Sequence, residues 1–282
     1  MFKKIKNFFQ SCISNKLAAF GFFIVISMFM IALLAPIIAP YPPDQQIYQD
    51  ARQSPSIKHF FGTDLLGRDI LSRIIYGTRI SLIVGFISMA IAATCGIIAG
   101  LLSGYYGGWT DTIFMRTMDA LMAFPAILLA LLIMSVLGPS LANAIIAVGI
   151  IYTPTFARLI RASALSIREK EYLEAARSIG MPNWLIMSKV ILLNSLSPII
   201  VQISLGIGYA ILVEAGLSFL GLGVQPPKPA WGSMLGEARN LMIFAPWMAT
   251  FPGLAIFFAV IGFNLMGDGL REALDPHRIE EK

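Results

Sequence analysis

Long stretches without a charged side chain are the strongest constraint that this sequence places on its fold. They interrupt a chain in which 57% of the residues are hydrophobic and only 13% are charged. A helix needs about 20 apolar residues to cross the hydrocarbon core of a bilayer, so each stretch can hold at least one span. The uncharged stretches are residues 17–43, 80–110, 120–157, 190–213 and 240–267. The sequence therefore predicts an all-α integral membrane protein.

One of these stretches, 120–157, is too long for a single helix. Gly138 and Pro139 interrupt it, and such a pair ends one helix and permits a turn into another. Pro125 is expected to bend the helix that precedes this turn. The sequence thus predicts six transmembrane helices, at 17–39, 80–103, 117–137, 141–159, 197–217 and 248–267.

Residues 1–16 form a short basic amphipathic leader ahead of the first span. A secretory signal peptide is one interpretation, but the apolar run is longer than a typical signal core and lacks a small-residue cleavage site. We therefore expect a retained helix. Residues 17–282 are predicted to form one six-span domain.

The distribution of lysine and arginine predicts which loops face the cytoplasm. With the N-terminus inside, most of the basic residues fall in cytoplasmic segments, as the positive-inside rule requires. The prediction is an N-in, C-in topology with outer loops at 40–79 and 221–245 and a cytoplasmic loop at 160–196. This bias accounts for the net charge of +5, so no nucleic-acid partner is needed.

The first outer loop contains charged residues at i,i+4 spacing. Asp64 and Arg68 form one such pair, and Asp69 and Arg73 form another. We expect these pairs on a surface helix that is capped by Thr63 or Asp64 and leads into the second span.

The second outer loop, 221–245, combines several prolines with Trp231. This combination is compatible with an ordered lip that carries an interfacial aromatic anchor, and equally with a plain connector.

Residues that could support catalysis or metal binding are sparse. His59 and His277 lie in loops away from cysteines and carboxylate clusters, so we expect ordinary surface residues. Cys12 is predicted in the cytoplasm and Cys95 in mid-membrane, so a disulfide between them is sterically implausible, and no metal-ligand spacing occurs. An integral membrane enzyme would need a cluster of such groups at one membrane face. We therefore expect a non-catalytic chain without a metal site.

The stretch "EYLEAARSIGMPNWLIMSKV", residues 171–190, differs from the apolar runs beside it. At helical spacing it has an apolar face of Tyr172, Ala175, Ala176 and Ile179 and a polar face of Glu171, Glu174 and Ser178. Gly180 suits the left-handed position after a helix, and Pro182 suits the start of the next one. The predicted structure is helix, tight turn, helix.

Two interpretations of this amphipathic helix remain open: docking against another protein, or lying on the membrane surface. Ala175 and Ala176 would let the helix sink into a groove, with Glu174 at the edge of the contact. The small apolar face and the glutamates disfavour an anionic membrane surface. Docking is the favoured interpretation, because a helix this short needs a partner.

This segment resembles the EAA loop of permease subunits of ATP-binding-cassette importers. The matches to the family pattern are Glu174, Ala175, Ala176, Gly180 and Leu192, while Val190 stands for isoleucine and Leu193 replaces proline. "FGTDLLGRDILSRIIYGTRISL", "GGWTDTIFMRTMDALMAFP", "LGPSLANAIIAVGI", "EAGLSFLGLGVQPPKPAWGSML" and "ALDP" are similar to the second permease subunit of dipeptide, oligopeptide and nickel importers. The resemblance covers nearly the whole chain.

The resemblance implies a type I importer permease in a bacterial cytoplasmic membrane, surrounded by lipid. It implies that the loop is a coupling helix, and that the partners are a second homologous permease, two ATP-binding subunits and an extracytoplasmic substrate-binding protein. This chain has no G-x-x-x-x-G-K-[ST] pattern, so ATP and Mg²⁺ would be bound by the partner subunits.

Glu214 lies near the outer end of the predicted fifth span, where a carboxylate is either functional or a structural hydrogen-bonding group. Small or polar residues on the same helix suit close packing or a polar path. In the resembled family this span lines the path, so Ser204 and Gly208 are candidate lining residues together with Glu214. Arg116 and Asp119 are spaced to neutralise each other locally.

The predicted function is one half of the translocation path for di- or oligopeptides, coupled to a separate ATPase. A nickel or metallophore importer remains an alternative, because these importers share the motifs. A self-sufficient secondary transporter would need coupling-ion carboxylates at mid-membrane and usually inverted repeats, and Glu214 alone supplies neither.

Overall fold

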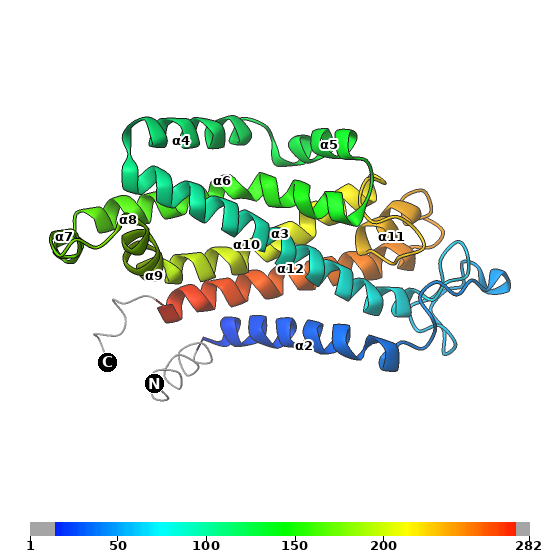
Figure 1. The fold of residues 1–282 in the computed structure, drawn as a ribbon. Helices are drawn as coiled ribbons and strands as arrows, with labels where there is room; N and C mark the ends of the chain where they lie inside the picture. Colours follow the sequence, from blue (N-terminus) through cyan, green and yellow to red (C-terminus); the bar gives the residue numbers. More distant parts are fainter. Residues whose placement is uncertain (1–14, 275–282) are drawn as a thin grey trace.

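The structure is a computed structural model that describes residues 15–274, so most of the predicted leader and His277 lie outside the described residues. The described chain forms an elongated helical bundle without a regular β-strand (Figure 1). Five of its helices are long and apolar enough to cross a membrane. They are α2 (Lys16–Ile38), α3 (Ile70–Tyr106), α6 (Leu141–Arg168), α10 (Leu196–Phe219) and α12 (Trp247–Leu274). These helices confirm five of the six predicted spans.

The remaining predicted span, 117–137, is not one helix. It consists of α4 (Gly108–Met122) and α5 (Ala126–Leu137), which differ in direction by 94°. Pro125 causes the break, because it lacks an amide hydrogen and disfavours a helical conformation of the residue before it. The predicted bend at Pro125 is confirmed. The prediction that one helix continues through Pro125 was wrong. The pair is apolar enough for a sixth span that is broken at Pro125, and its 94° bend equally fits a re-entrant loop.

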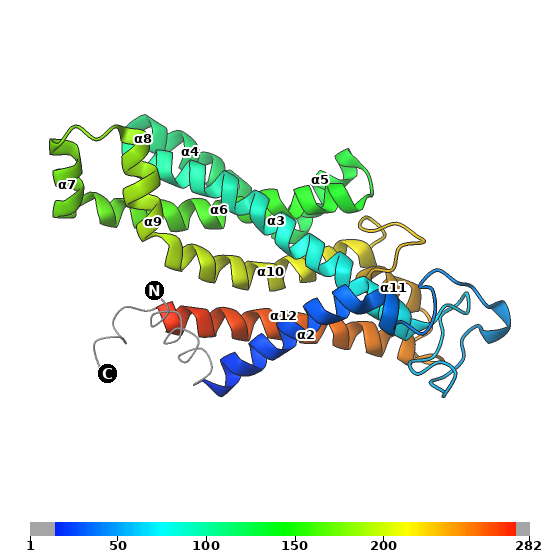
Figure 2. The same cartoon turned by 60° about the horizontal axis from the view of Figure 1, so that its bottom comes forward.

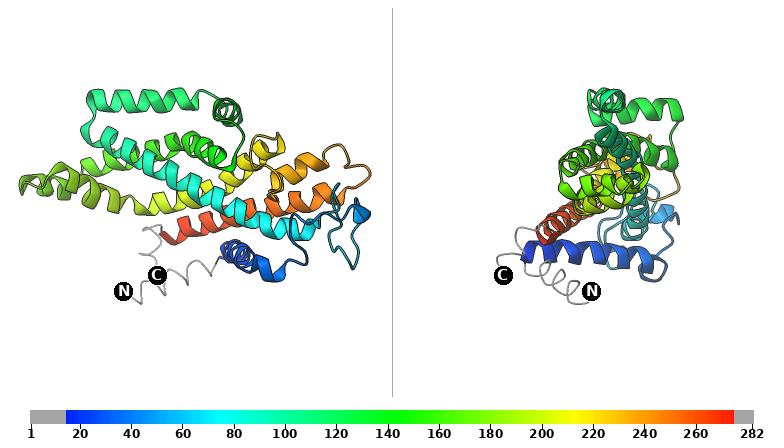
Figure 3. Two further views of the ribbon diagram at one scale, coloured as in Figure 1. Left: turned by 45° about the vertical axis from the view of Figure 1, so that its right-hand side comes forward. Right: turned by 60° about the vertical axis from the view of Figure 1, so that its left-hand side comes forward.

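Several helices extend beyond the predicted spans. Helix α3 begins at Ile70, because the Asp69 carboxylate caps it by accepting from the Ser72 amide at 2.8 Å. Helix α6 continues to Arg168, toward the cytoplasmic end. Figure 3 shows α4 and α5 along one side of the bundle and α2 along the opposite side.

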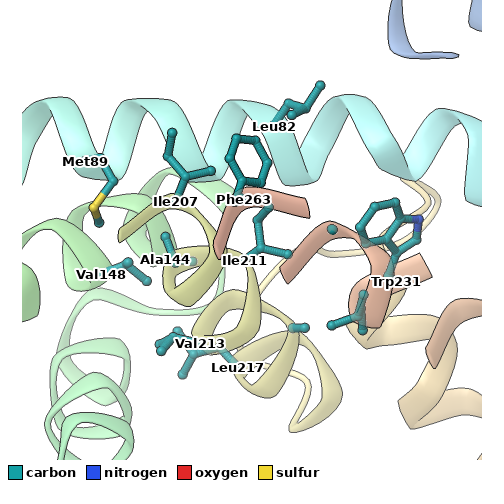
Figure 4. Packing of buried hydrophobic residues seen from close by; sticks show 14 of the residues in the cluster. Leu82, Met89, Ala144, Val148, Ile207, Ile211, Val213, Leu217, Trp231 and Phe263 are labelled. Atoms are coloured by element: carbon teal, nitrogen blue, oxygen red, sulfur yellow. The ribbon is translucent and has the colours of Figure 1, made fainter. Parts of the chain in front are cut away.

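Close packing of α3 on α6 forms the centre of the bundle. A Cβ atom at Gly96 would lie 2.5 Å from Phe156 Cβ, and one at Gly104 would lie 2.6 Å from Ala164 Cβ. These glycines therefore let the two helices approach each other, as small residues do in membrane bundles. Figure 4 shows the apolar core that α3, α6, α10 and α12 share, with Met89 and Phe263 among its members.

The outer segment, residues 39–69, contains one short 3₁₀ turn, Tyr48–Asp50, and folds over the outer end of α3. The predicted ion pair between Asp64 and Arg68 is present, but it lies in a turn and is buried, so the predicted surface helix was wrong. Asp69 does not pair with Arg73: it caps α3 and lies 2.9 Å from His59 Nδ1.

His59 is buried, with 1% of its surface exposed, so the prediction of a surface residue was wrong. Its ring lies between Asp69 and Asp50, with Nε2 3.5 Å from an Asp50 carboxylate oxygen. Lys58 donates to that carboxylate at 2.5 Å and thereby lowers the pKa of Asp50 below its ordinary value. These contacts hold the outer segment against α3.

The second outer loop contains α11 (Trp231–Ala238), which packs against α10 and α12. Trp231 is 2% exposed and donates from Nε1 to the Ile74 carbonyl oxygen at 3.1 Å. The loop is thus ordered, but Trp231 is a core residue and not an interfacial anchor.

Candidate functional site

The cytoplasmic loop between α6 and α10 has the predicted helix, turn, helix form. Helix α7 (Glu171–Ser178) ends before Gly180, which has a φ of +76°. Pro182 then precedes α8 (Asn183–Leu185), which leads through the π-helical segment Ile186–Ile191 and α9 (Leu192–Asn194) into α10. Leu193, which stands where the EAA pattern has proline, lies within α9. Figure 2 shows α7 at the end of the molecule opposite the outer segment.

Helix α7 presents two different apolar surfaces. Leu173 is fully buried, and Ala176 is 8% exposed, so both point into the protein. Leu173 belongs to a core cluster with Ile167 of α6 and Ile186 of the π-helical segment. Leu173 is not part of the predicted apolar face, although its i,i+3 spacing places it on the same side as Ala176. Ala176 was predicted on the exposed side, and that prediction was wrong.

The adjoining surface of α7 carries Tyr172, Ala175 and Ile179, which remain exposed in this chain. The exposed fractions of Tyr172 and Ile179 are 48% and 78%. We call these three residues the exposed face of α7. A surface of this kind at the tip of a loop is typical of a contact with another molecule.

The orientation of α7 is fixed by contacts with its neighbours. The Arg177 guanidinium lies 5.4 Å from the centre of the Tyr105 ring, a cation–π contact. The Tyr105 hydroxyl donates to the Asn183 side chain at 2.7 Å, which connects α3 with α8. Glu171 and Glu174 are exposed and form no ion pair within residues 15–274. The exposed face therefore has a fixed direction and a charged rim.

The three candidate path residues lie on α10, away from this loop. The Ser204 hydroxyl donates to the Ile200 carbonyl oxygen at 3.0 Å, and Gly208 faces α12, since a Cβ there would lie 3.3 Å from the Val260 carbonyl oxygen. Glu214 is 1% exposed. All three point into the subunit, and their lining of a path stays a prediction.

Glu214 has a structural partner. The Ser218 hydroxyl donates to its carboxylate at 2.5 Å and accepts from the Val224 amide at 3.0 Å. The carboxylate thus connects α10, through Ser218, to the turn that follows the helix. This contact agrees with the structural interpretation of Glu214.

The predicted local pair of Arg116 and Asp119 does not form. Asp119 instead accepts from Arg158 of α6 at 2.6 Å. Asp111 likewise accepts two hydrogen bonds from Arg161, both of 2.6 Å. The acidic residues of α4 therefore connect it to α6.

A family model described as "Binding-protein-dependent transport system inner membrane component" matches residues 96–280. The chain belongs to this family. A second model, for the N-terminal TM domain of oligopeptide transport permease C, matches residues 5–55. The predicted membership of an ABC importer permease family is thereby confirmed, as is the bacterial inner-membrane location.

Curated relatives cover nearly the whole chain. The dipeptide transport system permease protein DppC of Alkalihalophilus pseudofirmus is 48% identical over 268 residues, which are 95% of this chain and 88% of the relative. The glutathione transport system permease protein GsiD of Pectobacterium atrosepticum is 46% identical over 272 residues, 96% of this chain and 90% of the relative. This chain is accordingly a permease subunit of an ATP-driven importer and not its ATPase.

A solved structure supports the fold. The inward-facing MetNI methionine ABC transporter contains a chain with a TM-score of 0.58 and 17% identity, and the match covers 73% of this chain and 98% of that one. At this identity the likeness concerns the fold alone. It confirms the importer permease architecture.

Proposed function

We propose that this subunit forms half of a translocation path for di- or oligopeptides together with a second homologous permease. The names of two relatives support a short peptide as the substrate, since one is named for dipeptides and the other for glutathione, itself a short peptide. Two ATP-binding subunits would supply ATP and Mg²⁺ on the cytoplasmic side. A binding protein would deliver the peptide to the outer segment.

The exposed face of α7 is the observation that carries the proposal of coupling. A helix of eight residues is too short to be stable alone, so its position depends on what it contacts. Leu173 and Ala176 hold one side of it to the permease, while Tyr172, Ala175 and Ile179 are left for a partner. We infer that this face docks into a groove of one ATP-binding subunit.

The energetics of such docking are favourable. Full burial of a side chain such as Ile179 contributes about 1.5–3 kcal/mol, and the small Ala175 allows close approach of the helix backbone. Because α7 is attached firmly on its other side, movement of the ATPase would be transmitted to α6 and α10. Closure of the ATPases could then rock the spans as rigid bodies.

Uptake by the complete importer tests the substrate class. The purified complex in proteoliposomes, with ATP inside and the binding protein outside, is expected to take up a radiolabelled dipeptide. Unlabelled dipeptides and glutathione should compete, whereas Ni²⁺ should not. Competition by Ni²⁺ or by a metal chelate alone would contradict peptide import and favour a metallophore importer.

A further inference from the structure

A hollow of about 170 Å³ lies where the break between α4 and α5 meets α6 and α10. Leu121, Met122 and Phe124 form its apolar wall, and Tyr152, Thr155 and Tyr209 supply its polar groups. The rings of the two tyrosines lie 5.1 Å apart. We call this hollow the tyrosine notch.

The hydroxyls of the tyrosine notch have no partner within the described residues. None of the hydrogen bonds in residues 15–274 involves the side chains of Tyr152, Thr155 or Tyr209. The neighbouring Thr153 behaves differently, because its hydroxyl donates to the Gly149 carbonyl oxygen at 2.9 Å. Tyr209 is 37% exposed, so its hydroxyl is open to a further contact.

Unpaired hydroxyls are costly at this depth of a membrane protein. A polar group without a hydrogen bond in an apolar medium costs several kcal/mol, and lipid tails offer none. Tyr152 and Tyr209 lie near the middle of the predicted spans 141–159 and 197–217, and Thr155 lies closer to the cytoplasmic end of the first. Its hydroxyls therefore need water, a neighbouring subunit or a polar substrate.

A second, larger hollow lies between α4 and α6, closer to the predicted cytoplasmic side. It measures about 490 Å³ and is lined by the α4 residues Asp111, Arg116 and Asp119 and the α6 residues Arg158 and Arg161. On α6, Arg158 follows Thr155 by one helical turn, toward the cytoplasmic end. Polar groups of α6 thus line both hollows, and in the second hollow Arg158 and Arg161 pair with aspartates of α4.

We propose that the tyrosine notch contacts the peptide as it crosses the membrane, an inference that rests on the proposed peptide import. A hydroxyl both donates and accepts, so it can pair with the N–H and C=O groups of a peptide backbone whatever its sequence. The aromatic rings and the apolar wall accommodate side chains.

Removal of single hydroxyls tests this role. Tyr209→Phe and Thr155→Val keep the volume nearly unchanged, and each is expected to slow dipeptide uptake by about three- to tenfold, the usual effect of one lost hydrogen bond. Thr153→Val is the matched control, because its hydroxyl bonds only its own helix. Its uptake should remain within about twofold of the unchanged importer. Unchanged uptake in both notch variants would overturn the proposal.

A thiol-accessibility experiment separates a path from a subunit contact. Tyr209→Cys, placed in an importer without Cys12 and Cys95, should react with a hydrophilic thiol reagent, and excess dipeptide should slow the reaction. An unreactive Tyr209→Cys, or one that forms a disulfide only with the second permease, would overturn the proposal. Failure of the unchanged importer to take up any dipeptide would instead contradict the proposed function, because the reagent reaction does not depend on transport.

Discussion

The outer segment and helix α7 lie at opposite ends of the molecule and are held in place in different ways. In the outer segment, buried charges pair with one another inside the chain. Arg68 contacts both Asp64 and Glu237 of α11, and Arg73 lies near the same two carboxylates. Helix α7 is held by two apolar side chains and one cation–π contact. The outer segment is thus held by charges that pair within the chain, whereas α7 keeps an apolar surface exposed.

The largest effect is expected from breaking the outer charge cluster. Asp64→Ala leaves Arg68 and Arg73, which are 4% and 1% exposed, without their nearest carboxylate. Loss of one partner of a buried pair costs about 3–5 kcal/mol, so the free energy of unfolding should fall by that amount. Thermal unfolding of the purified permease measures it. Asp44→Ala, at an exposed outer carboxylate, is the control and should change little.

Loss of the buried anchor of α7 should loosen this helix alone and leave the rest of the bundle stable. Leu173→Ala removes its buried anchor, at a cost of about 2–5 kcal/mol, and should speed hydrogen exchange of the α7 amides without affecting the spans. Ile179→Ala is the control, because that side chain is 78% exposed in this chain. Equal exchange in the two variants would show that Leu173 does not hold the helix.

A smaller effect is expected at the contact between α11 and α10. A Cβ atom at Gly232 would lie 2.2 Å from the Ala215 carbonyl oxygen, so Gly232→Ala must push the two helices apart. The expected loss of stability is about 1–3 kcal/mol, measured by the same thermal unfolding. Gly253→Ala on α12, where the nearest atom is 4.0 Å away, should cause no loss. Similar losses in the two variants would contradict tight packing of α11.

The smallest effect on stability, and a clear one on coupling, is expected from Glu174→Arg. This exposed residue lies on the rim of α7, so the permease should remain inserted while reversed charge weakens docking and reduces uptake. Glu169→Arg makes the same change just before α7 and is the control. Unchanged transport-coupled ATPase activity in the Glu174 variant would rule out a role for this charge in docking.

The sequence alone predicted most of the fold, because long uncharged runs and the Gly180 turn are local signals. It did not predict the outer charge cluster, since Arg68 and Glu237 are far apart in the sequence and meet only in the folded chain. It also placed Ala176 on the exposed side of α7 and left out Leu173. The i,i+3 spacing of these two residues indicates a shared side, but that this side turns inward depends on the π-helical segment that packs against Leu173.

The central claim is that the exposed face of α7 contacts an ATP-binding subunit. A photo-crosslinking amino acid in place of Ile179 in the assembled importer tests it most directly, with the same group at the exposed outer residue Ile57 as control. The account predicts a crosslink from position 179 to the ATP-binding subunit and none from position 57. A crosslink from position 179 to lipid alone would contradict it and would show that α7 lies on the membrane surface.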